Sequence, residues 1–560
     1  MKKPDQPDES PKVIGRRIEI IGIRRNIDNG RVTVVISFYY KGENWTTEMP
    51  RGKLTRSKVV ELLDLGADVA DHKVSEVLIF LNHQEEKAPM INVHTRIGWD
   101  RYEGTLVFKA AQAIGCESTY SGSLGIQAAG TYEGWAATVS SEVLGHTPLE
   151  LALVIGLTAP VVSLLAMLEV ISFGVIVVHV FGNSTMGKTT ATMLAVSPFG
   201  YPNTSGNGLI KTWYSTQNAI IGHFRENFGI AMGLDEASSF SGNDFSQLVY
   251  QLAGGQDKSR MDKEGNQRGS SGWSTTIISN AEHSLTGKTK QNIGIRMRLL
   301  ELGNMTWTKS AENADAIREG LLKNYGHAGP AFVRHLMELG PEALVDRWNQ
   351  WREKCFQLIE KKDHFSHRIA DKQAVIMATA DLASEALQLN LNLEAIHRLI
   401  IDIDNNSAES RDIGQNAYEY LLESIERHKK KFSKETDKKL FPPEGHEVWG
   451  KYVVEREDIV EICILPKVFK ELMTEGGFED TEVVLKEWKN KGLLDHDKEK
   501  TMRKRNIQQG GGRLYVHCIR IRREPPADDS GEPGGLQEKT RTRPAPGAKT
   551  LQEEPDLFEE

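Results

Sequence analysis

The sequence predicts an α/β fold in which strands alternate with helices around a phosphate-binding loop. Residues 182–189 read GNSTMGKT and satisfy the pattern GxxxxGK[ST]. An apolar, β-branched run precedes the loop at residues 175–181, and a helical run follows it at residues 190–195. Strand, glycine loop and helix in this order form the context in which the pattern binds phosphate. A second apolar run ends in the acidic pair Asp235-Glu236, as expected for a strand that brings carboxylates to a nucleotide.

Length and composition fit a multidomain protein with ample core material. The 560 residues are enough for about three or four domains. Hydrophobic residues make up 39% of the chain, and its net charge is −8, so any contact with nucleic acid must come from local basic patches. The four cysteines are scattered and show no CxxC spacing, which implies neither a zinc site nor a disulfide framework. We therefore expect a reduced, cytoplasmic setting.

One stretch of the chain resembles a membrane span. Leu151–Phe181 is strongly apolar, but Pro160 and Glu169 interrupt it, and its last part runs directly into the phosphate-binding loop. A buried helix followed by the first core strand explains this stretch without a membrane. The N-terminal residues 1–12 lack the apolar segment of a signal peptide. We expect no association with a membrane.

Changes in periodicity along the chain predict its divisions. Asn29-Gly30 between two alternating apolar runs predicts a β-hairpin, and helical patterns follow near residues 55–64 and 75–86. Ala, Leu, Glu and Lys at helical spacing dominate later. The predicted divisions are a disordered N-terminus at 1–12, an α+β domain at 13–130, the phosphate-loop ATPase core at 131–305, an all-α lid at 306–440, a winged helix at 445–523 and a disordered acidic tail at 524–560.

The predicted winged helix has helices near Pro466–Met473 and Thr481–Lys491, followed by two strands around Gly510–Gly512. From Thr501 to Arg523 there are seven Lys or Arg residues and no Asp or Glu. Such a wing suits a DNA backbone, and the residues expected to contact DNA are Arg503, Arg505 and Arg513. A protein-docking domain is the alternative, because the second helix also carries acidic residues.

The phosphate loop predicts ATP and Mg²⁺ as cofactors. Backbone N–H groups near Gly187 and the positive end of the next helix would hold phosphates. Lys188 would reach the β- and γ-phosphates, and the hydroxyl of Thr189 would bind Mg²⁺. The predicted nucleotide contacts are Gly182, Asn183, Ser184, Thr185, Met186, Gly187, Lys188, Thr189 and Thr190.

Three further residues are expected to complete hydrolysis. Asp235 would order Mg²⁺, and Glu236 would polarise the attacking water as the general base. A third apolar strand ends at Asn280. In ATPases of the AAA+ type, a polar residue at this place orients the water together with the acidic pair. Ser279 is the alternative to Asn280, and an ordinary strand-end cap also remains open.

Two basic features point beyond the nucleotide. Arg296 and Arg298 lie on a strand-like run, where one of them could reach the γ-phosphate of a neighbouring subunit; a solvated edge strand is the alternative. The polar segment 254–268 reads as a projecting hairpin. In ring helicases of superfamily 3 such a hairpin grips DNA, and here a mobile surface loop is the alternative. Its expected DNA contacts are Lys258, Arg260, Lys263 and Arg268.

Residues from about 85 to 390 resemble the "domain of unknown function 927" family of helicase-like ATPases from phages, plasmids and genomic islands. The matching motifs include Thr95-Arg-Ile-Gly-Trp, GNSTMGKTT, Lys211-Thr-Trp-Tyr-Ser-Thr-Gln-Asn and Leu234-Asp-Glu-Ala-Ser. The resemblance favours Arg298 over Arg296. Relatives tend to have Ser-Thr-Gly-Glu where this chain has Ile278-Ser-Asn-Ala-Glu282, which leaves the role of Asn280 open.

The resemblance implies an ATP-dependent DNA helicase, a homo-hexameric AAA+-like ring that moves along one strand during replication of a mobile element. A second reading is an AAA+ ATPase that loads or remodels another replication protein without unwinding DNA. A third is a DNA-binding regulator without enzymatic activity, against which the set Lys188, Asp235 and Glu236 argues.

The end of the chain suggests one more partner. Gln552, Leu557 and Phe558 match the motif Gln-x-x-Leu-x-Leu-Phe, by which bacterial replication proteins bind the sliding clamp, while Pro555 replaces its first leucine. Two large apolar side chains on a flexible tail suit a hydrophobic pocket. A solubilising acidic tail is the alternative.

Overall fold

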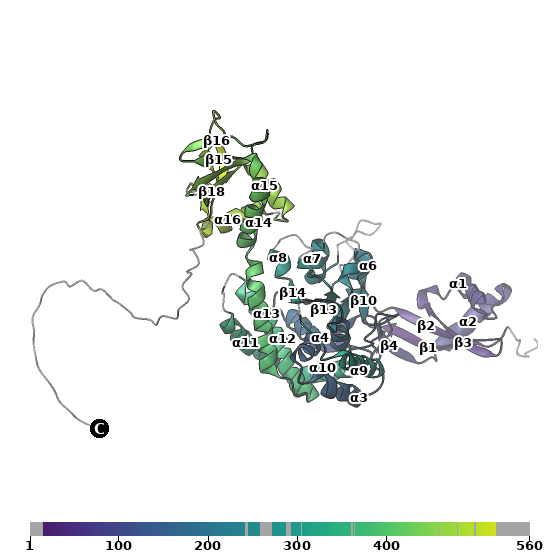
Figure 1. The fold of residues 1–560 in the computed structure, drawn as a ribbon. Helices are drawn as coiled ribbons and strands as arrows, with labels where there is room; N and C mark the ends of the chain where they lie inside the picture. Colours follow the sequence, from purple (N-terminus) through teal and green to yellow (C-terminus); the bar gives the residue numbers. More distant parts are fainter. Residues whose placement is uncertain are drawn as a thin grey trace, which may run out of the picture. The chain divides into compact units, whose positions relative to one another are not determined.

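The computed structural model forms two compact units, Met1–Lys429 with Pro466–Lys491, and Lys430–Leu465 with Gly492–Glu560 (Figure 1). The predicted disordered ends and the clamp motif at Gln552, Leu557 and Phe558 lie outside the residues that the structure describes. Those residues are 15–240, 245–257, 271–286, 293–303, 305–359, 362, 365–456, 458–478, 480–497 and 500–521, of which the side chains of 293, 296 and 406–411 are not described.

The first unit begins with a five-stranded sheet in the order β3-β2-β1-β4-β8. Its antiparallel pair β1–β2 confirms the predicted hairpin, with Gly30 at φ +70° in the turn. Two helices, α1 and α2, confirm the helical patterns and close one core over the sheet. The elements are β1 (Ile18–Asn26), β2 (Val32–Tyr40), β3 (Glu43–Pro50), α1 (Arg56–Val60), α2 (Val74–Glu85), β4 (Met90–His94) and β8 (Thr119–Tyr120).

A second sheet has the order β11-β5-β6-β7. Its strands are β5 (Ile97–Tyr102), β6 (Thr105–Lys109), β7 (Ala113–Ile114) and β11 (Asn227–Phe228). Lys109 is buried and reaches the carboxylates of Asp28 and Asp100 at 2.6 Å each. Because an unpaired buried charge is costly, this triad fixes the β1–β2 turn against the second sheet.

The core sheet has five parallel strands in the order β10-β12-β13-β9-β14. The strands are β9 (Val175–Phe181), β10 (Ile210–Thr212), β12 (Met232–Asp235), β13 (Thr275–Ala281) and β14 (Leu299–Gly303). Parallel pairing places all five carboxyl ends at one edge, where ligands of open α/β sheets bind. The α/β class predicted from the sequence is therefore confirmed for this region.

Helix α4 (Thr147–Met167) is the stretch that resembles a membrane span, and 94% of its most apolar window is buried inside the protein. It packs against α5 (Lys188–Val196), which follows the phosphate loop. The two helices approach so closely that a Cβ on Gly156 would lie 1.7 Å from the carbonyl oxygen of Ala195. A buried helix followed by a core strand is what the sequence predicted.

The remaining core helices are α3 (Tyr132–Thr138), α6 (Gln217–Phe224), α7 (Ser246–Gly254) and α8 (Ile293–Arg296). A helical region then follows, in which α11 and α12 lie side by side (Figure 1). Its helices are α9 (Ala311–Lys323), α10 (Ala328–Leu339), α11 (Pro341–Leu358), α12 (Ser366–Leu387), α13 (Leu393–Arg411) and α14 (Ile413–Arg427).

The prediction that this region stays all-helical to residue 440 is wrong at its end. Residues Phe432–Thr436 and Lys439–Phe441 form strands β15 and β16, and Phe432 is buried where β15 pairs with β17 (Gly450–Glu455). Strand β15 also pairs with β16 across a two-residue turn in which Asp437 and Lys438 have positive φ, so pairing on both sides overrides the local helical composition. These strands open the sheet of the second unit, which also contains β18 (Asp458–Ile464), β19 (Leu494–Asp495), β20 (Arg503–Arg505) and β21 (Leu514–Arg520).

Both helices predicted for the winged helix form, as α15 (Pro466–Glu475) and α16 (Thr481–Asn490). They belong to the first unit, where Nε1 of Trp488 donates a hydrogen bond to the carbonyl oxygen of Gly414 at 2.7 Å. The strand pair β20–β21 around Gly510–Gly512, which we call the wing, belongs to the second unit.

The contact between α4 and α5 generates a prediction about stability. Gly156→Ala should lower the free energy of unfolding of the core by about 1–3 kcal/mol, because the added methyl group forces the two helices apart. Gly222→Ala in α6 is the matched control, since a Cβ added at Gly222 would meet no atom within 4 Å. This control should be neutral or more stable by up to about 1 kcal/mol. Thermal melting followed by circular dichroism compares the two, and equal melting temperatures would refute the close-packing argument.

Candidate nucleotide-binding site

The phosphate loop links the end of β9 to the first residue of α5. Gly187 adopts φ +80°, and a Cβ at this position would come within 2.6 Å of the side chain of Thr308. Glycine is thus required both by the left-handed backbone and by the space available. The backbone N–H of Trp307 donates to the carbonyl oxygen of Met186 at 2.8 Å, which fixes the loop against the segment that follows β14.

Lys188 spans this loop. Its Nζ donates to the carbonyl oxygens of Gly182 at 2.8 Å and Asn183 at 2.7 Å. A cavity of about 400 Å³ opens beside it at the carboxyl edge of the core sheet. The residues that line it are Ser184, Thr185, Met186, Gly187, Lys188, Thr189, Thr190, Glu236, Asn280, Glu282, Thr308, Ala311, Ala314, Asp315 and Arg318.

Asn280 brings the acidic pair together. Its Oδ1 accepts a hydrogen bond from the backbone N–H of Glu236 at 2.9 Å, and its Nδ2 donates to Oδ1 of Asp235 at 2.7 Å. Asn280 is buried, and the strand that carries it lies between those of the phosphate loop and the acidic pair. The structure therefore unites three residues that are far apart in sequence.

Glu236 has an unusual backbone. Its φ is +60°, in the left-handed region that residues with a side chain seldom occupy. Strained residues of this kind persist where their surroundings hold them, often at functional sites. Here Asn280 accepts from the backbone N–H, and Oγ of Ser239 donates to the carbonyl oxygen at 2.6 Å. The arrangement turns Glu236 into the cavity that it lines.

Ser279, the alternative to Asn280, makes its hydrogen bonds inside the core. Its hydroxyl accepts a hydrogen bond from Nε1 of Trp213 at 3.1 Å and lies 3.0 Å from Nδ1 of His179, inside the core. Asn280 is the residue of this strand end that lines the cavity. The geometry favours Asn280.

The residues present fit a magnesium ion. Thr189 lines the cavity with its hydroxyl-bearing side chain, and the carboxylates of Asp235 and Glu236 stand at the same edge of the sheet. Hydroxyl and carboxylate oxygens are the hard ligands that Mg²⁺ prefers, with water completing its shell. Thr189 and Asp235 are the residues that would hold it.

Helix α9 adds residues that sequence reasoning missed. Asp315 and Arg318 line the cavity from this helix, with Nη1 of Arg318 lying 3.6 Å from Oδ1 of Asp315. An i,i+3 charge pair on an amphipathic helix gives no sequence signal of its own. Only the packing of α9 on α5 brings the pair to the phosphate loop.

Arg298 does not line the cavity of its own subunit. The run predicted as one strand is instead α8 followed by β14, so the expectation that Arg296 and Arg298 share a strand face is wrong. Arg298 is exposed, its Nη1 donates to the carbonyl oxygen of Gly294 at 2.9 Å, and its guanidinium lies 4.8 Å from the ring centre of Tyr250.

The predicted DNA-binding hairpin, with Lys258, Arg260, Lys263 and Arg268, lies outside the described residues. Its two ends are described. The backbone N–H of Asp257 donates to the carbonyl oxygen of Ser271 at 3.0 Å, and Gln256 forms an antiparallel bridge with Gly272. Arg225 holds Asp257 through an ion pair of 2.6 Å. The chain thus leaves and re-enters the core as adjacent antiparallel segments.

Of the three arginines expected to contact DNA from the wing, two are already paired. Arg505 lies 2.7 Å from Oδ2 of Asp495, and Arg503 lies 3.3 Å from the same atom. Arg513 is exposed.

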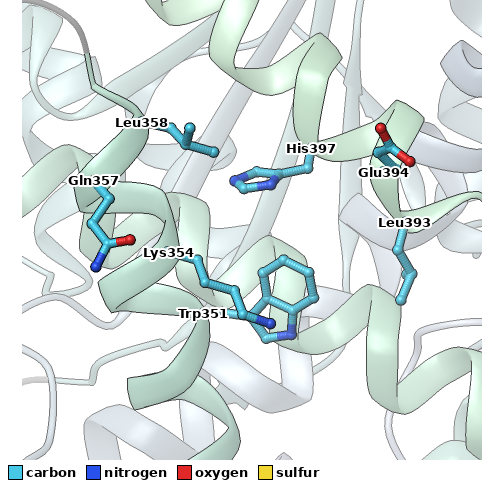
Figure 2. Close-up of a pocket in the computed structure, with 7 residues that line it drawn as sticks. All are labelled: Trp351, Lys354, Gln357, Leu358, Leu393, Glu394 and His397. Carbon is cyan, nitrogen blue, oxygen red and sulfur yellow. The ribbon is translucent and has the colours of Figure 1, made fainter.

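A second cavity, of about 430 Å³, lies between α11 and α13 (Figure 2). Trp351 forms one wall, fixed by a hydrogen bond from Nε1 to Oδ2 of Asp381 at 3.1 Å. Nζ of Lys354 lies 4.5 Å from the centre of the Trp351 ring, and burial lowers the pKa of His397. The lining of this cavity contains no glycine, and Lys354 is its only Lys or Arg residue, so it lacks the features of a phosphate-binding site.

Two protein families have models that match parts of this chain. The model of the family "Domain of unknown function (DUF927)" matches residues 1–272, and that of the "Cch helix turn helix domain" matches residues 412–524. The first match starts earlier than the resemblance seen in the sequence and ends before Arg298. None of the curated protein sequences matches this chain significantly.

Two solved structures are similar. One is titled "SCCmec type IV Cch - active helicase"; it is 22% identical with a TM-score of 0.75, over 91% of this chain and 94% of that one, which shows a shared fold. The other, the "A form apo structure of NrS-1 C terminal region", is 7% identical over 89% of this chain and 96% of that one, and its TM-score of 0.28 is too low to show one. The predicted resemblance is confirmed: residues 1–272 match the model of the DUF927 family, and residues 412–524 match that of the Cch helix turn helix domain.

Proposed function

We propose that this protein is an ATP-dependent DNA helicase or translocase of the AAA+ type that acts in replication of a mobile element. The observation that carries the proposal is the bridge from Asn280 to Asp235 and Glu236 at the edge of the phosphate-loop cavity. The fold shared with a protein titled an active helicase, and the helix-turn-helix family match, support DNA as the partner.

Each residue of the site has a role that follows from its position. Lys188 and the backbone N–H groups of the loop would hold the β- and γ-phosphates, while Thr189 and Asp235 would hold Mg²⁺. Bound ATP and Mg²⁺ supply the phosphoryl group and its charge neutralisation. Glu236 would accept a proton from the attacking water, and Asn280 keeps both acidic residues in place.

The exposed position of Arg298 supports hydrolysis at shared subunit interfaces. An arginine outside the cavity of its own subunit can stabilise transition-state charge only on another subunit's nucleotide. We therefore propose a ring, and a homo-hexamer is the assembly that the family resemblance favours. The cytoplasm is its proposed setting, and docking to a sliding clamp through the tail remains a further proposal.

Tyr214 supports a coupling between the ATP site and a DNA strand. Its side chain is 78% exposed in the turn between β10 and α6, although the preceding Trp213 is buried. The backbone N–H of Trp213 donates to the carbonyl oxygen of Asp235 at 3.1 Å. Exposed aromatic side chains stack on the bases of single strands without regard to sequence. A shift of the Asp235 strand would thus move Tyr214.

The catalytic assignment predicts different failures for different substitutions. Glu236→Gln should bind ATP normally and hydrolyse it about 100- to 10,000-fold more slowly, because the general base is lost. Lys188→Ala should lose ATP binding itself. Equilibrium binding of a fluorescent ATP analogue and steady-state phosphate release separate the two effects. Normal hydrolysis by Glu236→Gln would mean that another group activates the water.

The shared-interface model predicts complementation. The Arg298→Ala protein alone should bind ATP but fail to hydrolyse it, because every ring then lacks the arginine. Mixing it with Lys188→Ala protein should restore part of the ATPase activity, since a mixed interface can combine an intact loop with an intact arginine. Absence of recovery, in mixtures shown by light scattering to form joint oligomers, would place Arg298 outside the reaction.

Unwinding of a forked duplex tests the proposed function directly. The unmodified protein should separate the strands with ATP, and Tyr214→Ala should reduce strand separation more strongly than basal ATPase activity. Stacking contributes about 1–3 kcal/mol per base, which predicts at least about fivefold weaker single-strand binding. Tyr214→Phe is the control and should behave normally. DNA-stimulated ATP hydrolysis without strand separation would instead indicate a loader or remodeller.

A further inference from the structure

We propose that the outward face of the wing, formed by Lys504 and Tyr515 with Lys500 and Arg513, binds the phosphate backbone of duplex DNA. Arg503 and Arg505 would hold the wing in shape instead. The proposal rests on the proposed function in taking DNA as the partner, and it names the surface of the second unit that makes the contact.

Strand register separates the basic residues of the wing into two faces. In the antiparallel pair β20–β21, Lys504 lies opposite Tyr515, while Arg503 lies opposite Val516. Val516 is fully buried and Tyr515 is 46% exposed. Successive side chains of a strand point to opposite faces. Lys504 therefore shares the outward face with Tyr515, and its two arginine neighbours share the inward one.

The inward arginines are held by a buried carboxylate. Asp495, with a side chain only 11% exposed, lies 2.7 Å from Arg505, 3.3 Å from Arg503 and 3.4 Å from Arg520. Glu461 lies 4.0 Å from Arg505 as well; burial raises the pKa of Glu461, and the nearby Arg505 opposes that rise. A phosphate group could engage these arginines only by competing with the buried Asp495, which would then keep fewer partners, and this is unfavourable.

On the outward face, by contrast, the basic residues are exposed and not paired with carboxylates among the described residues. Nζ of Lys504 lies 5.0 Å, and Nζ of Lys500 5.7 Å, from the centre of the Tyr515 ring. Lys500, Lys504 and Arg513 are exposed, and none of them forms an ion pair with a carboxylate among the described residues. Two lysines thus lie beside one amphipathic ring near the end of a hairpin, and the exposed Arg513 precedes the strand that carries the ring.

Charge complementarity identifies the occupant. The whole chain carries a net charge of −8, so exposed cations that have no ion-paired carboxylate among the described residues are a local feature of this face and not a general property of the surface. Lysine and arginine side chains are the usual phosphate contacts, and tyrosine hydroxyls also donate to phosphate oxygens. A duplex backbone offers the regular negative charge that this face matches.

The test compares adjacent residues of one strand in the full-length protein. Binding to a closed, dumbbell-shaped DNA duplex, which has no free end for a ring to thread, is measured by fluorescence anisotropy over a range of salt concentrations. Lys500→Gln combined with Lys504→Gln should weaken binding several-fold and reduce the log–log salt slope by about 1.8, or about 0.9 per lost phosphate contact. Tyr515→Ala should weaken binding further.

The control is Arg503→Gln combined with Arg505→Gln, which removes the same charge from the inward face. It should retain the salt slope and lower the melting temperature instead, because Asp495 loses partners. An unchanged slope for the lysine variants, or a loss confined to the arginine variants, would overturn the proposal. Fork unwinding by the unmodified protein tests the proposed function separately. If the protein unwinds forks but the Lys500 and Lys504 variants bind the dumbbell duplex as well as the unmodified protein, only the wing assignment is contradicted.

Discussion

The hydrogen bonds between the side-chain amide of Asn280 and both acidic residues are the constraint on which the candidate site depends. One strand lies between the phosphate-loop strand and the acidic strand, and Asn280 at the end of this middle strand holds the acidic pair. The amide supplies one acceptor and one donor: Oδ1 accepts a hydrogen bond from the backbone N–H of Glu236, and Nδ2 donates one to Oδ1 of Asp235. A carboxylate in place of Asn280 could not donate in this way, and a hydroxyl is too short to reach both.

The scaffold behind this bridge is held together by close backbone packing. Helix α4 is buried almost throughout, and Gly156 lets it approach the end of α5 at a distance that no side chain would permit. Nε1 of Trp99 donates to the carbonyl oxygen of Pro160 at 2.8 Å, which ties the second sheet to the middle of the same helix. Since α5 begins at Lys188, the phosphate loop is fixed at one end by a strand paired on both sides and at the other by this helix pair.

Local signals allowed much of this to be predicted from the sequence. The Asn29-Gly30 turn, the loop at 182–189 and the apolar strands ending in Asp235 and Asn280 each depend on short-range chemistry, and the structure forms all of them. What the sequence did not show depends on distant pairing. Strand β15 lies between its hairpin partner β16 and the more distant β17, and Arg318 reaches the cavity because α9 packs on α5. The position of Arg318 has no pattern within its own segment.

The basic wing shows the same limit at the level of single residues. The count of Lys and Arg between Thr501 and Arg523 correctly marks a positive segment, yet a count cannot separate alternate residues of one strand. The partner that decides is Asp495, which stands in another strand of the sheet and pairs with Arg503 and Arg505. An arginine held by a buried carboxylate is a structural group, whereas the lysine between the two arginines remains exposed. Assigning nucleic-acid contacts from charge therefore requires the register of the sheet. Residue type alone points to Arg503 and Arg505, whose guanidinium groups are already paired with Asp495.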